Sequence, residues 1–188
     1  MIPEYFALVG AGIASLGGLY YLYCTIKGTV KPHRMTWFFW TLFPMVAFVA
    51  QLKQDVGMVI WITFASGFLP LMVFIAASFN PKAYWKIQKV DYLFALIGML
   101  GIVLWYLTDN ANLAITFSII ADFAVAIPTI IKTFKFPETE TWKSYALNSV
   151  GFGLGVFTIT EWTYENYSFV VFLLVVNVFF TILAARKP

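Results

Sequence analysis

The chain has 188 residues, of which 61% are apolar, 20% are aromatic and only 11% are charged, and its mean hydropathy is +0.83. This composition excludes a soluble globular domain, in which about 25% of residues are charged, and indicates an integral membrane protein. The connections between apolar segments have only about 4 to 12 residues, which leaves no room for an extramembrane catalytic or nucleic-acid-binding domain. We therefore interpret the net charge of +3 as related to the orientation of the chain in the membrane.

Seven apolar segments are long enough to cross a bilayer, for which a helix needs about 20 residues. In chain order they cover approximately residues 5–26, 35–52, 57–79, 91–108, 112–131, 142–160 and 167–185. The sequence therefore predicts an all-α membrane protein with seven transmembrane helices.

The basic residues are distributed unevenly between the connections. Eleven of the twelve Lys and Arg residues fall in the first, third and fifth connections or at the C-terminus, and only Lys53 falls on the other side. Because cytoplasmic loops are enriched in Lys and Arg, we predict that the N-terminus lies outside and the C-terminus in the cytoplasm, with a bacterial inner (plasma) membrane as the expected location. Six tryptophans near segment ends are typical of aromatic belts at the two interfaces: Trp37, Trp85 and Trp142 inside, and Trp61, Trp105 and Trp162 outside.

The sequence contains an internal repeat with an offset of 105 residues. Five of the twelve positions from 26 to 37 match their counterparts: Ile26, Lys27, Pro32, Thr36 and Trp37 align with Ile131, Lys132, Pro137, Thr141 and Trp142. The offset pairs the first three segments with the last three and leaves the fourth alone. Since three helices cross the membrane an odd number of times, the fourth restores the orientation of the second copy, which predicts a 3+1+3 arrangement of parallel repeats.

This arrangement divides the chain into a first triple-helix bundle (1–80), a linker containing the fourth helix (81–110) and a second triple-helix bundle (111–188). In each repeat the proline is expected to set the turn, and Thr36 or Thr141 to cap the helix that follows. His33, the only histidine, is expected to be a solvated turn residue.

In topology the chain resembles the SWEET/PQ-loop superfamily of small-solute transporters. The family carries a Pro-Gln pair on the first helix of each repeat, where this chain has Pro128-Thr129 and, at the aligned place, Tyr23-Cys24. The sugar-transporting branch has prolines on the first two helices of each repeat, matched here by Pro128 and Pro44, and an asparagine on the third, matched by Asn177. The resemblance implies a divergent relative that transports a small solute.

Asp122 lies in the middle of the fifth segment and is the only acidic residue away from a connection or a helix end. A carboxylate at the bilayer centre costs at least about 2.5 kcal/mol, so we expect it to face the interior of the bundle. Two interpretations stay open. Asp122 is either a functional group, acting as a proton-coupling group or as the counter-ion of an amine, or a protonated side chain that hydrogen-bonds to a neighbouring helix.

Four further residues are candidates for contact with the solute. Asn177 lies at a similar depth in the seventh segment, Asn148 and Tyr145 share one face of the sixth, and Trp40 aligns with Tyr145. Each also has a structural interpretation, as an interhelical hydrogen bond or an aromatic anchor, and the sequence does not decide whether Asp122 and Asn177 share one cavity. Pro44 and Pro128 interrupt their helices and are candidate hinges, although neighbouring helices often satisfy the freed carbonyls.

The residues needed for an enzyme or a metal centre are missing from the sequence. Cys24 is the only cysteine, and no Ser-His-Asp set or carboxylate pair falls within the apolar segments. We therefore predict no enzymatic activity, no metal and no cofactor.

The favoured interpretation is a transporter of a small polar solute, such as a sugar, an amino acid or a related metabolite, that works by alternating access. Proton coupling through Asp122 is compatible with this interpretation. Membrane lipid is the other expected partner, and a homo-oligomer is compatible with the sequence. Two alternatives stay open: a non-transporting interaction or sensor protein, whose basic loops contact anionic lipid, and a passive channel.

Overall fold

The computed structural model describes residues 2–54, 56–108 and 110–186. Met1, Asp55, Asp109, Lys187, Pro188 and the side chain of Trp105 lie outside the described residues. Within these ranges the chain forms helices and no strands. The α-helices are α1 (Phe6–Lys27), α2 (Arg34–Leu52), α3 (Ile60–Phe79), α4 (Lys89–Tyr106), α5 (Ala111–Lys135), α6 (Trp142–Phe157) and α7 (Tyr164–Ala185), with short 3₁₀ helices η1 (Pro81–Ala83) and η2 (Pro137–Thr139).

All seven predicted segments form helices, with small differences at their ends. α5 continues past Pro128 to Lys135, beyond the predicted end near residue 131, and α6 stops at Phe157 rather than near residue 160. Gly28 ends α1 with a φ of 73°, a left-handed conformation that glycine adopts without strain, and its N–H donates to the carbonyls of Cys24 and Thr25.

The start of α2 corrects the expectations for Thr36 and His33. His33, not Thr36, is the N-cap, and its Nδ1 accepts a hydrogen bond from the backbone N–H of Thr36. The Thr36 hydroxyl instead donates to the carbonyl of Val125 on α5, 2.7 Å away. His33 is 1% exposed and is therefore not a solvated turn residue. Thr141 does occupy the N-cap position of α6, but its side chain makes no capping hydrogen bond.

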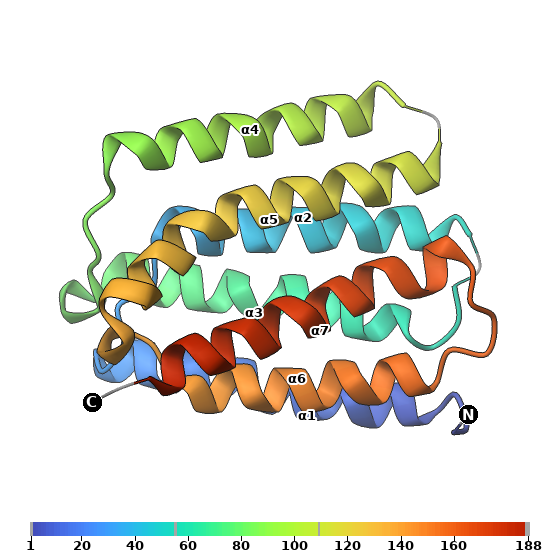
Figure 1. The fold of residues 1–188 in the computed structure, drawn as a ribbon, viewed down its shortest axis with the longest axis horizontal. Coiled ribbons are helices and arrows are strands. Elements are labelled where there is room, and N and C mark those ends of the chain that lie inside the picture. Colours follow the sequence, from blue (N-terminus) through green and yellow to red (C-terminus); the bar gives the residue numbers. More distant parts are fainter. Residues whose placement is uncertain (1, 55, 109, 187–188) are drawn as a thin grey trace.

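The helices lie side by side in two layers, with α4 at one edge (Figure 1). In one layer α3 packs between α1 and α2, and in the other α7 packs between α5 and α6. The layers meet where α6 packs on α1 and α5 packs on α2, and α4 packs mainly on α5. The two termini lie at opposite ends of the bundle, which we call the N-terminal end and the C-terminal end (Figure 1).

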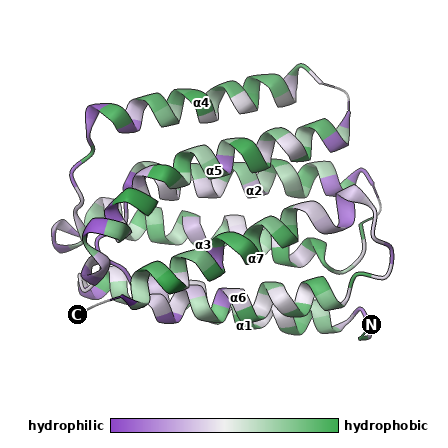
Figure 2. Ribbon diagram, viewed as in Figure 1, coloured by the Kyte–Doolittle hydropathy of each residue, from purple (hydrophilic) through white to green (hydrophobic). Residues whose placement is uncertain are grey.

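Several helices have the length and composition of membrane spans. Among the described residues α1, α2, α3, α5 and α7 are long and apolar enough to cross a bilayer, whereas α6 has only 16 residues. Hydrophobic residues cover the shafts of the helices, and hydrophilic residues gather mainly toward the two ends of the bundle (Figure 2). Large apolar side chains are also exposed on α4, including Leu93, Leu96 and Leu100. A helical protein with this surface is suited to a lipid environment.

The contact between α1 and α6 depends on small residues. A Cβ atom added at Gly10 would overlap the backbone carbonyl of Gly151, and one added at Gly151 would overlap both the carbonyl of Gly10 and Ala14. The small-residue faces therefore let the two backbones approach closely, as they commonly do between membrane helices.

Candidate functional site

A cavity of about 80 Å³ lies between the two layers, near the middle of the bundle. Residues from α1, α2, α3, α5, α6 and α7 line it, and no described side chain of α4 does. All five residues predicted to contact a solute are among its lining residues: Trp40, Asp122, Tyr145, Asn148 and Asn177. Asp122 and Asn177 thus share one cavity, the point that the sequence leaves open.

Asp122 projects from the middle of α5 and is 3% exposed. Its Oδ1 is buried and has no hydrogen-bond partner among the described residues. The bond between Thr36 and Val125 fixes the register of the antiparallel helices α2 and α5. Three residues after Thr36 on α2 is Phe39, and three residues before Val125 on α5 is Asp122. Because the helices are antiparallel, Phe39 and Asp122 lie level with each other, and Trp40 is the next residue on α2. Along the bundle axis the backbone of Asp122 therefore lies at about the depth of Trp40, which also lines the cavity.

Asn148 and Asn177 hydrogen-bond to each other across α6 and α7. The Nδ2 of Asn148 donates to the Oδ1 of Asn177 over 3.1 Å, and the Nδ2 of Asn177 donates to the carbonyl of Leu173 over 2.9 Å. A Cβ atom at Gly17 would overlap the Oδ1 of Asn148, so α1 packs directly against Asn148. Both residues line the cavity. Within the protein Asn148 uses one of its N–H groups, and Asn177 uses one N–H group and its oxygen.

Five aromatic side chains form a closed ring of contacts on the cavity wall, and we call them the aromatic cluster. Successive ring centroids are 4.3 Å apart from Tyr21 to Trp37, 5.3 Å from Trp37 to Trp40, 5.6 Å from Trp40 to Phe180, 4.9 Å from Phe180 to Tyr145 and 6.0 Å from Tyr145 back to Tyr21. The members come from α1, α2, α6 and α7, so the cluster joins the two layers.

Trp37 is one of these residues and is only 6% exposed, which corrects its assignment to the interfacial belt. The repeat counterpart Trp142 is 41% exposed, as a belt residue should be. Two polar groups on the cavity lining have no partner among the described residues, the Nε1 of Trp37 and the Oγ of Ser144. Together with Asp122 they offer a solute an acid, an N–H donor and a hydroxyl.

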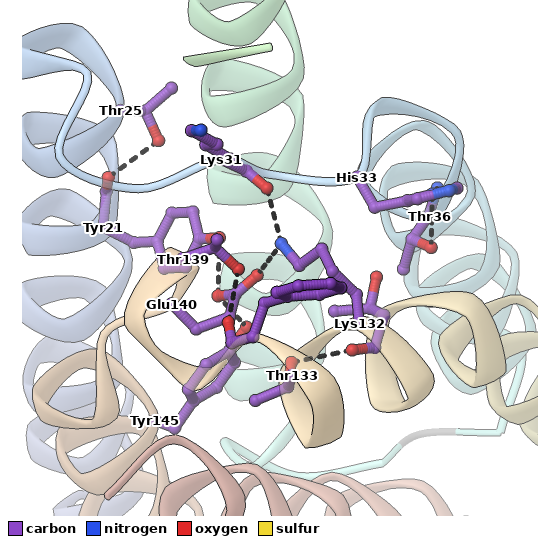
Figure 3. A network of polar contacts seen from close by, with 12 residues as sticks. Tyr21, Thr25, Lys31, His33, Thr36, Lys132, Thr133, Thr139, Glu140 and Tyr145 are labelled. Carbon is purple, nitrogen blue, oxygen red and sulfur yellow. Dashed lines mark hydrogen bonds and ion pairs between the residues drawn. The ribbon is translucent and has the colours of Figure 1, made fainter. Parts of the chain in front are cut away.

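A buried polar network lies beyond the aromatic cluster, toward the C-terminal end of the bundle (Figure 3). The hydroxyls of Tyr21 and Tyr145 both donate to the Oε2 of Glu140, over 2.7 Å and 2.9 Å. The other oxygen of Glu140 pairs with the ammonium group of Lys132, and both side chains are at most 1% exposed. The ammonium group also donates to the carbonyl of Lys31. These contacts connect α1 and the first hairpin with α5 and α6.

Sequence reasoning missed this network. Lys132 looks like one more lysine at a helix end, and its repeat counterpart Lys27 is exposed. Glu140 precedes α6 and has Met35 as its counterpart, so the repeat gives no hint of the ion pair. The one available signal is that Lys132 and Glu140 have opposite charges and flank a turn that contains a proline.

A second buried pair joins the first hairpin to α4. The Nε2 of His33 lies 2.9 Å from the Oδ2 of Asp91, which also accepts from the backbone N–H of Gln88 over 2.6 Å. Burial lowers the pKa of His33 by more than the neighbouring Asp91 carboxylate raises it. Neutral His33 therefore fits the site, with Nε2 donating to Asp91 and Nδ1 accepting from Thr36.

The two candidate hinge prolines are placed differently. Pro44 of α2 lines the cavity, whereas Pro128 of α5 is buried but does not line it. In the part of the chain that the structure describes, no three His, Cys, Asp or Glu residues are grouped so that they could hold a metal ion.

Comparisons with protein-family models, curated proteins and solved structures give no match to this chain. The site is therefore interpreted from its own residues.

Proposed function

We propose that this protein is a membrane transporter of a small polar solute that works by alternating access. The observation that carries the proposal is the cavity between the two helix layers, lined by a buried carboxyl group with an unpartnered oxygen. An unpartnered ionisable group inside an apolar bundle is costly, and in membrane proteins such groups mark solute or ion pathways.

The packing of the helices supports a 3+1+3 arrangement. Replacing α1, α2 and α3 by α5, α6 and α7 maps the main contacts among these six helices onto one another: α1 with α3 onto α5 with α7, α2 with α3 onto α6 with α7, and α1 with α6 onto α5 with α2. In the proposed mechanism the bundles 1–80 and 111–188 rock about the cavity, with α4 as a linker and the N-terminus outside. This is the behaviour implied by the resemblance to the SWEET/PQ-loop superfamily, and the proposed location is a bacterial plasma membrane.

The network around Glu140 supports a conformation closed toward the C-terminal end. Lys132, Glu140 and the aromatic cluster fill the space between the cavity and that end, and their contacts cross between the two layers. Opening on this side would require the Tyr21–Glu140 contact to break.

Counterflow into proteoliposomes tests the proposal. Labelled sugars, amino acids and amines are offered one at a time to vesicles preloaded with the unlabelled compound. We expect saturable counterflow of at least one compound, reduced in the Asp122→Asn variant and unchanged in Glu138→Gln, a matched acid-to-amide change on an exposed side chain. Conductance without saturation or counterflow would indicate a channel, and absence of any flux with a folded protein would indicate an interaction or sensor role.

The orientation is tested separately by labelling from outside. In a Cys24→Ser background, an impermeant maleimide should reach Glu161→Cys, at the N-terminal end, and should not reach Glu138→Cys. The reverse result would overturn the proposed orientation.

A further inference from the structure

We propose that the cavity binds a small organic cation, an ammonium compound that also carries an oxygen acceptor, with Asp122 as its counter-ion and the aromatic cluster as its wall. This inference rests on the proposed function, because it names the class of solute for that same site.

The charge balance of the cavity favours a cation. Asp122 lines it with a buried, unpartnered oxygen, and no Lys, Arg or His side chain is among the described lining residues. Lys132, the buried Lys or Arg side chain among the described residues, is already paired with Glu140 and hydrogen-bonded to a backbone carbonyl. A buried carboxyl group is costly in its ionised form unless it is paired or hydrogen-bonded. An ammonium ligand would supply the missing partner.

The aromatic cluster favours the same class of ligand. Aromatic ring faces attract cations within about 6 Å of the ring centroid, most strongly for tryptophan. Trp40 lies level with Asp122 by the register of α2 and α5, and it contacts both Trp37 and Phe180. A cation held at Asp122 would therefore lie at about the depth of Trp40.

The hydrogen-bonding groups argue against a sugar. A polyhydroxy solute needs many donors and acceptors, but the hydroxyls of Tyr21 and Tyr145 are bonded to Glu140, on the side away from the cavity. The amide of Asn148 is bonded to that of Asn177. The rings of the two tyrosines are thus available to a solute while their hydroxyl groups are not.

Besides Asp122, two residues of the cavity lining carry a buried polar atom without a partner among the described residues. The Nε1 of Trp37 is an unpartnered N–H donor, and the Oγ of Ser144 is an unpartnered hydroxyl. Both residues stand in the first turns of their helices, α2 and α6, on the C-terminal side of Asp122. A short molecule with an ammonium group at one end and a hydroxyl or carbonyl oxygen at the other satisfies all three groups.

Two pairs of probes, each differing mainly in charge, test this inference on the purified protein. Choline is compared with 3,3-dimethylbutan-1-ol, which replaces its quaternary nitrogen by carbon, and ethanolamine with ethylene glycol, which replaces its ammonium group by a hydroxyl. Isothermal titration calorimetry measures affinity, and the shift in Tm provides a second readout. We expect at least one cation to bind about tenfold or more tightly than its neutral partner.

Variants identify the groups responsible. Asp122→Asn should weaken binding of the cation about tenfold or more, and Trp40→Leu should weaken it about three- to tenfold, as expected for loss of a cation–π contact. Glu138→Gln should leave the affinity unchanged. The comparison of charged and neutral probes is made on the unaltered protein, so it does not depend on any variant folding.

The outcomes separate this inference from the proposed function. Equal or tighter binding of the neutral partners, absence of binding by both cations, or unchanged affinity in Asp122→Asn would overturn the cation assignment. Counterflow of a neutral solute alone would overturn it while leaving the transporter proposal intact. Selective cation binding without counterflow of that cation would support the assignment and count against transport.

Discussion

The hydroxyl of Tyr21 on α1 donates a 2.7 Å hydrogen bond to Glu140, 119 residues later in the chain, and both side chains are buried. Tyr21 lies on α1 and lines the cavity, whereas Glu140 directly precedes Thr141, the N-cap of α6, and is paired with Lys132. A movement that separates the two layers on this side must therefore break a hydrogen bond to a charged group. The energy needed to break this hydrogen bond therefore opposes opening of the cavity on this side of the bundle.

Glu140→Gln should be strongly destabilising. The variant keeps the shape of the side chain but leaves the buried Lys132 ammonium group without its counter-ion, which typically costs about 3–5 kcal/mol. Adding Lys132→Met should recover much of this loss, because it removes the unpaired charge. Thermal unfolding in detergent measures the effect, with Glu138→Gln as the exposed control. Additive losses in the double variant would show that the pair does not act as a unit.

Replacing each tyrosine of the network by phenylalanine should have a smaller effect. Tyr21→Phe and Tyr145→Phe keep the rings of the aromatic cluster and remove one hydrogen bond to Glu140, a bond to a charged acceptor worth about 1.5–3 kcal/mol. Both hydroxyls donate to the same oxygen. The loss of stability in the double variant should therefore differ from the sum of the losses in the two single variants. Unfolding of the two single variants and the double variant gives the coupling energy, and exact additivity would contradict a shared acceptor site.

The predictable and unpredictable parts of this protein have different physical origins. The helices could be predicted from the hydropathy of the sequence, because the middle part of each helix contacts other helices or the apolar surroundings. Asp122 and the other four predicted lining residues stand out because each is polar or aromatic within an apolar segment. The packing of α1 on α6 likewise follows a pattern of small residues, Gly10 and Gly151 among them, that is visible in the chain.

The buried polar pairs did not follow from the sequence, because their burial is a tertiary property. Lys132 sits at a helix end, where solvent is the usual surrounding, and it is buried only because Glu140 and the ring of Trp85, 5.4 Å from its ammonium group, cover it. His33 looks like an isolated turn residue because its partner Asp91 lies 58 residues away. Neither partner can be identified by spacing along one helix.

Stability should fall as the pH is lowered through the titration range of His33. Burial holds its pKa below the usual value of about 6.5, so the unfolded chain binds a proton more readily than the folded protein. The contribution of neutral His33 to the stability of the fold is therefore fully present above about pH 6.5. It is lost as the pH falls through the pKa of His33 in the folded state, which is lower. His33→Asn retains a side-chain cap for α2 and should remove this part of the pH dependence. Tm measured from pH 8 to pH 5 for both proteins checks the prediction, and identical profiles would contradict it.

Two glycines of α6 should respond oppositely to the same substitution. In Gly151→Ala the added Cβ would overlap the carbonyl of Gly10 and Ala14 on α1, so the two helices must move apart, and a loss of about 1–3 kcal/mol is typical of such overpacking. In Gly153→Ala the nearest atom, on Leu174, is 3.9 Å away, which is ordinary van der Waals contact. Because alanine favours a helix by about 1 kcal/mol over glycine, this variant should be neutral or more stable. Thermal unfolding of the two variants side by side measures the difference. A similar Tm for both would mean that α1 and α6 do not meet at Gly151.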